Sequence, residues 1–376
     1  MSDLQASEEL ILAVKKRKLS GDSQDEMDVS GPDTNKMKRS FRFWFHDGNV
    51  VLQTEDKQFR VHRSLLALHS KVFADMFSIP QPVQDPSSSA SVSGSGLTTT
   101  DGLNEMVEGC PVVRIYDDSS DISVLLSVLY GLDTVRDYDV ENHALELISL
   151  LKVGQKYEFG KILQDVLKEL RQRFPISLEE FEKHQPFPFN DGIFALVEAA
   201  HQFHLHSILP ALYANLFHIC STEEIQEQLG IFRGGPPATP NLVMSTRTLV
   251  HVLMSAQRYH LAIVKFHLPA FKTRGPSGEC NTPSICCSSF PTTLDYAENP
   301  ASPFNLAGTP FPDKEGTLLF SPHKPLCDKC RALVLPRYVG RRRNLWLDLP
   351  RLFGYDAQVY KDGGVSDFMP VEFKMA

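Results

Sequence analysis

Two cysteines near the C-terminal end have the spacing of metal ligands. Cys327 and Cys330 are separated by two residues, so both thiolates can face one tetrahedral zinc ion at about 2.3 Å. A zinc ribbon would need a second Cys-x-x-Cys pair, and the sequence has none. Further ligands would have to come from the preceding Pro- and Ser-rich stretch, which holds Cys280, Cys286, Cys287 and His323. The pair is therefore a candidate for half of a zinc site, but our expectation is reduced thiols, no metal and no cofactor.

Three histidines form a second metal candidate. His201 and His204 lie on one face of a predicted helix, and His206 follows shortly after. The same helix carries many apolar residues, so we expect these histidines to cover apolar neighbours or to hydrogen-bond locally. The sequence contains no nucleophile elbow, phosphate loop or dinucleotide-binding fingerprint. We therefore predict no catalytic activity.

The composition limits the class of protein. The chain has 376 residues, of which 42% are apolar, and this is enough for two or three globular units. The 38 basic and 46 acidic side chains give a net charge of -8, so nucleic acid and membrane surfaces are not expected partners. Seven cysteines, no Asn-x-Ser/Thr acceptor and no apolar N-terminal signal favour an intracellular protein, in the nucleus or the cytoplasm.

Two short basic runs leave a nuclear role open. The Lys-Lys-Arg-Lys sequence at 15–18 resembles a nuclear localisation signal. The arginines at 341–343, beside Trp346, could contact phosphates and stack on a base. In an acidic protein we interpret the arginine run as a solvated face.

Composition and periodicity divide the chain into segments. Period-two alternation predicts a hairpin over residues 50–61, and helical spacing follows up to Phe77 with Ser70 as a cap between two short helices. A strand is predicted at 111–116. The predicted organisation is a disordered tail (1–40), a mixed domain (41–174) with a flexible Ser/Pro-rich insertion (80–109), a helical region (175–272), a low-order linker (273–325) and a small C-terminal segment (326–376) that docks on the helical region.

The stretch from Asp47 to Phe77 resembles the opening of the BTB/POZ domain. The resemblance extends over roughly residues 41–174 and implies an α+β fold, a small sheet wrapped by helices, followed here by a mainly α-helical region. The whole layout resembles the BTB proteins of mushroom-forming fungi. The positions that carry the match are Asp47, Val50, Phe59, Val61, His62, Arg63, Leu66, Ala67, Ser70, Phe73, Met76 and Phe77.

The resemblance implies a non-catalytic scaffold for protein–protein interaction that pairs with itself or with another BTB protein. The polar residues Asp47, His62 and Arg63 either contribute to such an interface or cap buried backbone groups. The aromatic residues before Asp47 suit an interface, although they could equally form the edge of the domain's own core. These aromatic residues are Phe41, Phe43, Trp44 and Phe45.

The resemblance leaves two other roles open. Adaptors that bind a cullin scaffold of ubiquitin ligases usually carry an apolar-x-acidic signature after the Phe-x-x-Met-Phe helix, whereas this chain continues Phe77-Ser-Ile-Pro80. A cullin adaptor is therefore an alternative rather than the expectation. A nuclear transcription regulator is the second alternative.

Overall fold

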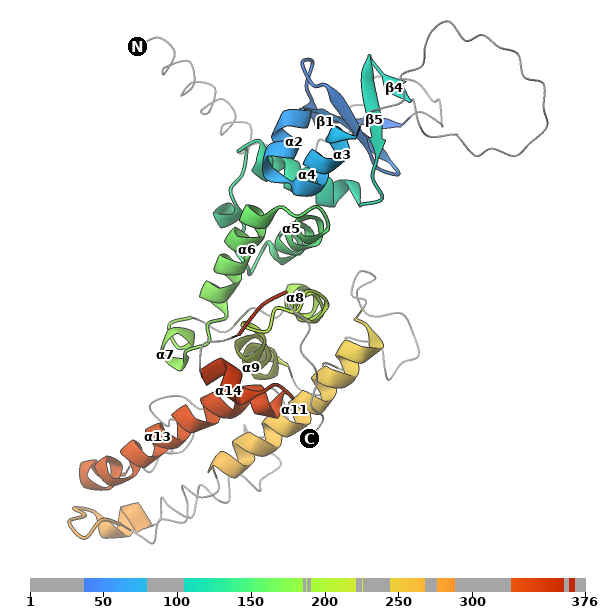
Figure 1. Cartoon of the computed structure of the whole chain (residues 1–376). Coiled ribbons are helices and arrows are strands. Elements are labelled where there is room, and N and C mark those ends of the chain that lie inside the picture. Colours follow the sequence, from blue (N-terminus) through green and yellow to red (C-terminus); the bar gives the residue numbers. More distant parts are fainter. Residues whose placement is uncertain are drawn as a thin grey trace, which may run out of the picture.

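The computed structural model describes residues 37–79, 105–184, 187, 191–220, 225, 244–267, 276–287, 326–361 and 365–368. A small sheet with short helices lies at one end of the molecule, and a helical body follows it (Figure 1). This confirms the predicted α+β class with a small sheet, adjoining helices and a helical region. Almost all of the predicted tail, and most of the insertion and the linker, lie outside the described residues.

In the part of the chain that the structure describes, five strands form the sheet, in the order β1-β3-β2-β5-β4. The predicted hairpin is present, because β2 pairs antiparallel with β3. β1 runs parallel to β3, and β5 runs parallel to β2. β1 is therefore one edge of the sheet. The strands are β1 (Lys38–Trp44), β2 (Val50–Gln53), β3 (Lys57–Val61), β4 (Met106–Val107) and β5 (Cys110–Arg114).

The sequence pattern did not predict β1 and β4. In β1 the buried residues Ser40 and Phe43 are three positions apart, because the strand is irregular between Arg39 and Trp44. The Ser40 hydroxyl accepts a hydrogen bond from the Phe43 N–H there, at 3.2 Å. β4 lies inside the predicted insertion. It pairs with β5 across a turn whose two residues, Glu108 and Gly109, both have positive φ (49° and 76°), as tight hairpins require.

Three α-helices of the described residues adjoin the sheet: α2 (Arg63–His69), α3 (Lys71–Ser78) and α4 (Ser119–Leu129). Ser70 caps α3 as predicted, since its hydroxyl accepts a hydrogen bond from the Phe73 N–H at 3.0 Å. Phe59 on β3 and Phe73 on α3 are both fully buried. The helices thus cover the apolar face that the hairpin presents.

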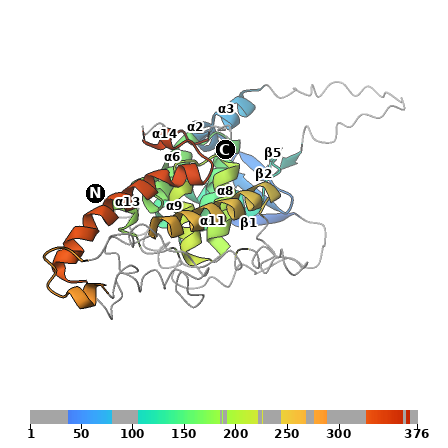
Figure 2. The same ribbon diagram turned by 90° about the horizontal axis from the view of Figure 1, so that it is seen from below.

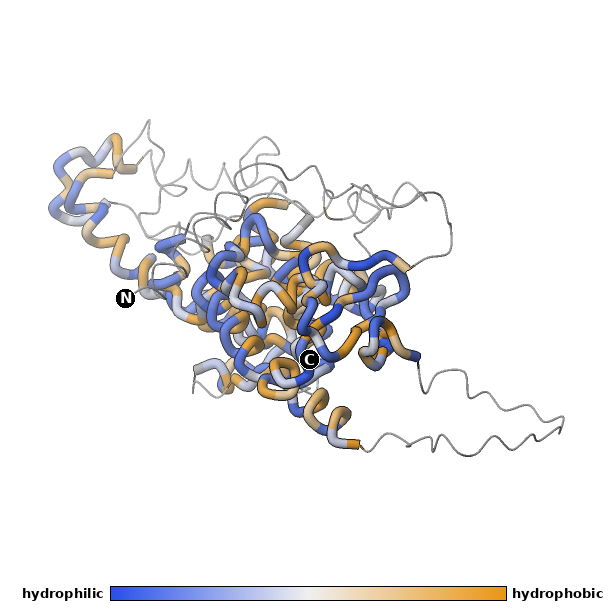
Figure 3. Tube along the Cα trace, turned by 90° about the horizontal axis from the view of Figure 1, so that it is seen from above, coloured by the Kyte–Doolittle hydropathy of each residue, from blue (hydrophilic) through white to orange (hydrophobic). Residues whose placement is uncertain are grey.

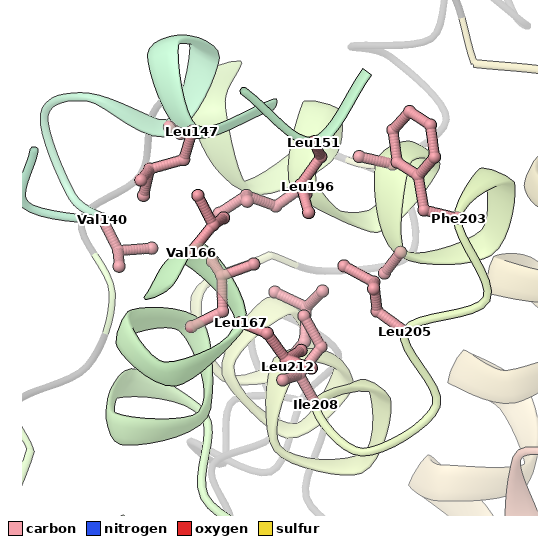
Figure 4. Close-up of a cluster of buried hydrophobic side chains, with 14 of the residues drawn as sticks. Val140, Leu147, Leu151, Val166, Leu167, Leu196, Phe203, Leu205, Ile208 and Leu212 are labelled. Carbon is pink, nitrogen blue, oxygen red and sulfur yellow. The ribbon is translucent and has the colours of Figure 1, made fainter. Parts of the chain in front are cut away.

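The helical body begins with α5, which packs against α4, α6 and α8. Apolar residues lie mainly in the middle of this body and polar residues mainly at its surface (Figure 3). One hydrophobic cluster runs from Phe43 to Tyr360, across the boundary predicted after residue 174 (Figure 4). The helices are α5 (Ala144–Lys156), α6 (Gly160–Arg173), α7 (Leu178–Phe181), α8 (Asp191–Gln202), α9 (Leu209–Ile219) and α11 (Thr246–His267).

The C-terminal segment docks on these helices, as expected. Its long helix α13 (Asp328–Leu352) runs beside α11 in both views (Figures 1 and 2), and α14 (Ala357–Lys361) follows. The Trp346 indole N–H donates to the Ile176 carbonyl at 2.7 Å, and the ring packs on Phe181 with centroids 4.6 Å apart. Within the described residues, no helix is both long and apolar enough to cross a membrane.

The arginine run at 341–343 is only in part the solvated face that we predicted. Arg343 is exposed and forms an exposed ion pair with Glu179. Arg342 is instead 5% exposed and forms an ion pair with Glu182 just after α7. Arg341 donates to the Phe266 carbonyl at the end of α11. The prediction failed for Arg341 and Arg342 because their side of α13 faces α11 and α7.

Candidate interaction surface

The four aromatic residues near the start of the sheet have different environments. Phe43 is 1% exposed and lies between Phe59 and Tyr130, with ring centroids 6.5 and 6.3 Å away. Phe45 is partly buried and stacks on Tyr130 at 4.5 Å. In this chain Phe43 therefore belongs to the core, which is one of the two interpretations that the sequence left open.

Trp44 and Phe41 are not part of that core. The guanidinium of Arg39 lies over the Trp44 ring at 4.5 Å, and Trp44 is partly buried. Phe41 is 96% exposed on the edge strand β1. Of the four aromatic residues, Phe41 is thus the one whose ring is left fully in solvent.

The basic residues on either side of Phe41 are paired within the chain. Arg39 forms an ion pair with Glu108 at 2.5 Å, and Arg42 forms one with Asp133 at 3.3 Å. Natural edge strands often carry unpaired charges that discourage association with another strand. Here the two carboxylates offset that charge in part, since Glu108 also pairs with Arg60 at 3.0 Å. The strand β1 thus presents a backbone edge and an apolar ring between paired arginines.

Asp47 and His62 come together just after the end of β1. His62 Nε2 lies 3.2 Å from the Asp47 carboxylate, and His62 Nδ1 lies 2.8 Å from the Tyr130 hydroxyl. A carboxylate only accepts hydrogen bonds, so the proton of a neutral His62 imidazole is assigned to Nε2. The Tyr130 hydroxyl then donates to Nδ1. The same hydroxyl accepts from the His62 backbone N–H at 3.1 Å.

This hydrogen-bonded chain runs from the core to the surface. Hydrogen bonding from His62 holds the pKa of Asp47 below its ordinary value, so the carboxylate, which is 84% exposed, stays ionised. Burial raises the pKa of Tyr130, which keeps its hydroxyl protonated. Sequence reasoning did not include Tyr130 among the site residues.

Arg63 is placed apart from this pair. Its side chain donates to the Phe77 carbonyl near the end of α3 at 3.0 Å and lies over the Phe77 ring at 4.8 Å. Its backbone N–H donates to Asn49 Oδ1 at 2.8 Å. Arg63 therefore joins α2 to α3, which is the capping role considered for it.

The two metal candidates of the sequence have different surroundings. Cys327 and Cys330 lie beside Cys280 and Cys286, and the four sulfurs are within 4.8 Å of one another. The His201 imidazole instead lies 2.6 Å from the Tyr213 hydroxyl, which also contacts His251 at 2.8 Å. His201 thus hydrogen-bonds locally, as expected.

The sheet, its edge strand and the two short helices can now be compared with known proteins. Residues 41–93 match the family model of the BTB/POZ domain. This segment includes most of β1 and all of β2, β3, α2 and α3, and BTB/POZ domains are protein-interaction modules. No curated protein matches the chain, so the narrower likeness to fungal BTB proteins gains no support.

Proposed function

We propose that this chain is a non-catalytic scaffold whose BTB/POZ segment binds a second copy of the same chain through the edge strand β1. The observation that carries the proposal is Phe41, an aromatic residue 96% exposed at the free edge of the sheet. Exposed edges with apolar side chains are prone to pair with another strand. A second β1 is the occupant that this edge fits best, because a two-fold arrangement would bring the two Phe41 rings to one interface.

The surroundings of Phe41 support an interface of the usual composition. Protein interfaces combine an apolar, often aromatic centre with a polar rim. Phe41 supplies the centre, while the exposed carboxylate of Asp47, fixed by His62, supplies a charged group close by in the sequence. Arg39 and Arg42 are each ion-paired within the chain, which lessens their repulsion of a second copy.

Two differently tagged copies of the full chain, expressed together, test this proposal. We expect one tag to retain the other for the wild type, and Phe41→Asp to abolish retention because it places a charge at the centre of the contact. Tyr116→Asp is the matched control, since Tyr116 is an aromatic residue 92% exposed outside β1. Retention that survives Phe41→Asp, or that is lost equally in Tyr116→Asp, would overturn the assignment of the interface to β1.

The same experiment separates the alternatives. Wild-type copies that do not retain each other, together with capture of a cullin or of a different BTB protein, would replace self-association by a heterologous pairing. A nuclear regulator could bind DNA through the arginines at 341–343. These arginines already contact Phe266, Glu182 and Glu179 of the same chain, and this disfavours DNA binding.

A further inference from the structure

Four cysteines from two distant segments meet at one end of α13. Cys280 and Cys286 belong to the segment 276–287, which contains a helical turn at 283–287. Cys327 caps the N-terminus of α13, and Cys330 lies in its first turn. The segment 276–287, orange in Figure 1, lies against this end of α13. All four Sγ atoms are within 4.8 Å of one another.

The spacing of the sulfurs suits one tetrahedral ion. Four thiolates about 2.3 Å from a zinc ion are about 3.8 Å apart from one another. The Sγ atoms of Cys280 and Cys327 are separated by 3.6 Å. A disulfide needs a far shorter separation, about 2.05 Å, and all four cysteines are free thiols.

Among the described residues, few apolar side chains pack between the segment 276–287 and α13. The apolar cluster at this place contains Cys286, Leu326 and Cys330, with Cys280 and Cys327 at its margin, and it is separate from the main core. An exposed ion pair between Lys329 and Glu279 adds a weak contact. A cluster made mostly of thiols buries little apolar surface, so packing alone stabilises it weakly. A bound metal ion would supply the missing stability.

Backbone N–H groups donate hydrogen bonds to two of the sulfurs. The Ser277 N–H donates to Cys330 Sγ, and the Cys327 N–H donates to Cys286 Sγ, both at 3.3 Å. The N-terminal end of α13, a helix of 25 residues, also favours negative charge. Such outer contacts orient thiolate ligands and offset the negative charge of a site with four of them.

We propose that Cys280, Cys286, Cys327 and Cys330 bind one structural zinc ion, which fastens the segment 276–287 to the start of α13. All four tetrahedral positions are filled by protein, so the site leaves no open position for catalysis. This replaces the sequence-based expectation of reduced thiols without a cofactor. The Cys-x-x-Cys pair is half of the site, and the other half is Cys280 and Cys286, two of the four further ligands that the sequence offered.

Cys286 and its neighbour Cys287 give a matched pair of variants. Cys286 is buried within the cluster, whereas Cys287 is exposed and is not among the four clustered cysteines. The full chain is purified under reducing conditions and its metal content measured by mass spectrometry of the elements. We expect one zinc per chain in the wild type and in Cys287→Ser, and at least a tenfold lower content in Cys286→Ser. A zinc-free wild type, or equal loss in both variants, would overturn the proposal.

Cobalt supplies a test that does not depend on a variant remaining folded. The wild-type full chain is stripped of metal and titrated with Co²⁺ under reducing conditions. We expect the visible bands of tetrahedral cobalt bound to thiolates, saturating at one equivalent per chain and disappearing when zinc is added. No such bands, iron in place of zinc in the purified protein, or disulfides among these four cysteines would each count against a zinc site.

Discussion

The ring of Phe45 stacks on the ring of Tyr130, with centroids 4.5 Å apart. This contact joins the residues that follow β1 to the end of α4. The aromatic residues near the start of the sheet therefore have different environments. Phe43 and Phe45 anchor β1 to the domain, and Phe41 is left exposed, as the proposed interface requires.

The Tyr130 hydroxyl stabilises the connection between β3 and α2. Replacing Tyr130 with Phe keeps the ring on Phe45 but leaves the His62 N–H without its acceptor. We expect the free energy of unfolding to fall by about 1–3 kcal/mol, the usual cost of an unsatisfied buried group. Urea denaturation measures this, with Tyr116→Phe as the exposed control. Equal stability of both variants would show that the hydroxyl contact is unimportant.

Truncation of Phe43 should lower the free energy of unfolding strongly, whereas truncation of Phe41 should hardly change it. Phe43→Ala removes a buried ring, and we expect it to lower the free energy of unfolding by about 3–5 kcal/mol. Phe41→Ala should change the stability of the single chain by less than about 0.5 kcal/mol, because the ring is exposed. Denaturation at a concentration low enough to avoid association compares the two. A large loss for Phe41→Ala would place that ring in the core of the single chain.

Neighbouring arginines on α13 allow a comparison of buried and exposed ion pairs. Arg342→Ala leaves Glu182 without its buried partner, and we expect it to cost about 3–5 kcal/mol. Arg343→Ala breaks an exposed pair with Glu179 and should cost at most about 1 kcal/mol. Thermal or urea unfolding distinguishes them. If the costs were similar, α13 would not be fastened to α7 through Arg342.

Burial of His201 makes the stability depend on pH. Burial lowers its pKa from 6.5 to about 3, so the unfolded chain binds a proton in this interval that the folded chain does not. The free energy of unfolding should therefore fall as the pH drops below 6.5, by up to about 1.4 kcal/mol per pH unit for this group. His251 and His218, whose pKa values burial also lowers, act in the same direction.

A substitution isolates the share of His201 in this dependence. In His201→Gln the slope of the unfolding free energy against pH should decrease by up to the contribution of one proton, about 1.4 kcal/mol per pH unit. Urea denaturation at several pH values measures this slope. His69→Gln, at an exposed position on α2, is the control. An unchanged slope in His201→Gln would mean that this imidazole accepts a proton in the folded state as readily as in the unfolded state.

The elements predicted correctly are those with local signals. The hairpin of β2 and β3, and the Ser70 hydroxyl that caps α3, depend on residues close together in the sequence. β1 was missed because its irregularity gives a spacing of three rather than two between Ser40 and Phe43. β4 was missed because Glu-Gly is a less common hairpin turn than Asn-Gly or Asp-Gly.

The candidate sites depended more on contacts between distant segments. The sequence identified Asp47 and His62 as a polar cluster, but only the fold shows that Tyr130 completes it. Spacing alone could not decide which aromatic residue of β1 stays exposed, since an edge strand can bury either face. Likewise, Cys280 lies 47 positions before Cys327, and only the packing of the segment 276–287 on α13 brings their sulfurs together.

The solution mass of the full chain tests self-association through β1 most directly. Light scattering from low to high micromolar concentration should give twice the 42.2 kDa of a single chain for the wild type and for Tyr116→Asp. Phe41→Asp should remain folded and should give the mass of one chain. A wild type that stays at the mass of one chain throughout, or a Phe41→Asp variant with the doubled mass, would contradict an interface centred on Phe41.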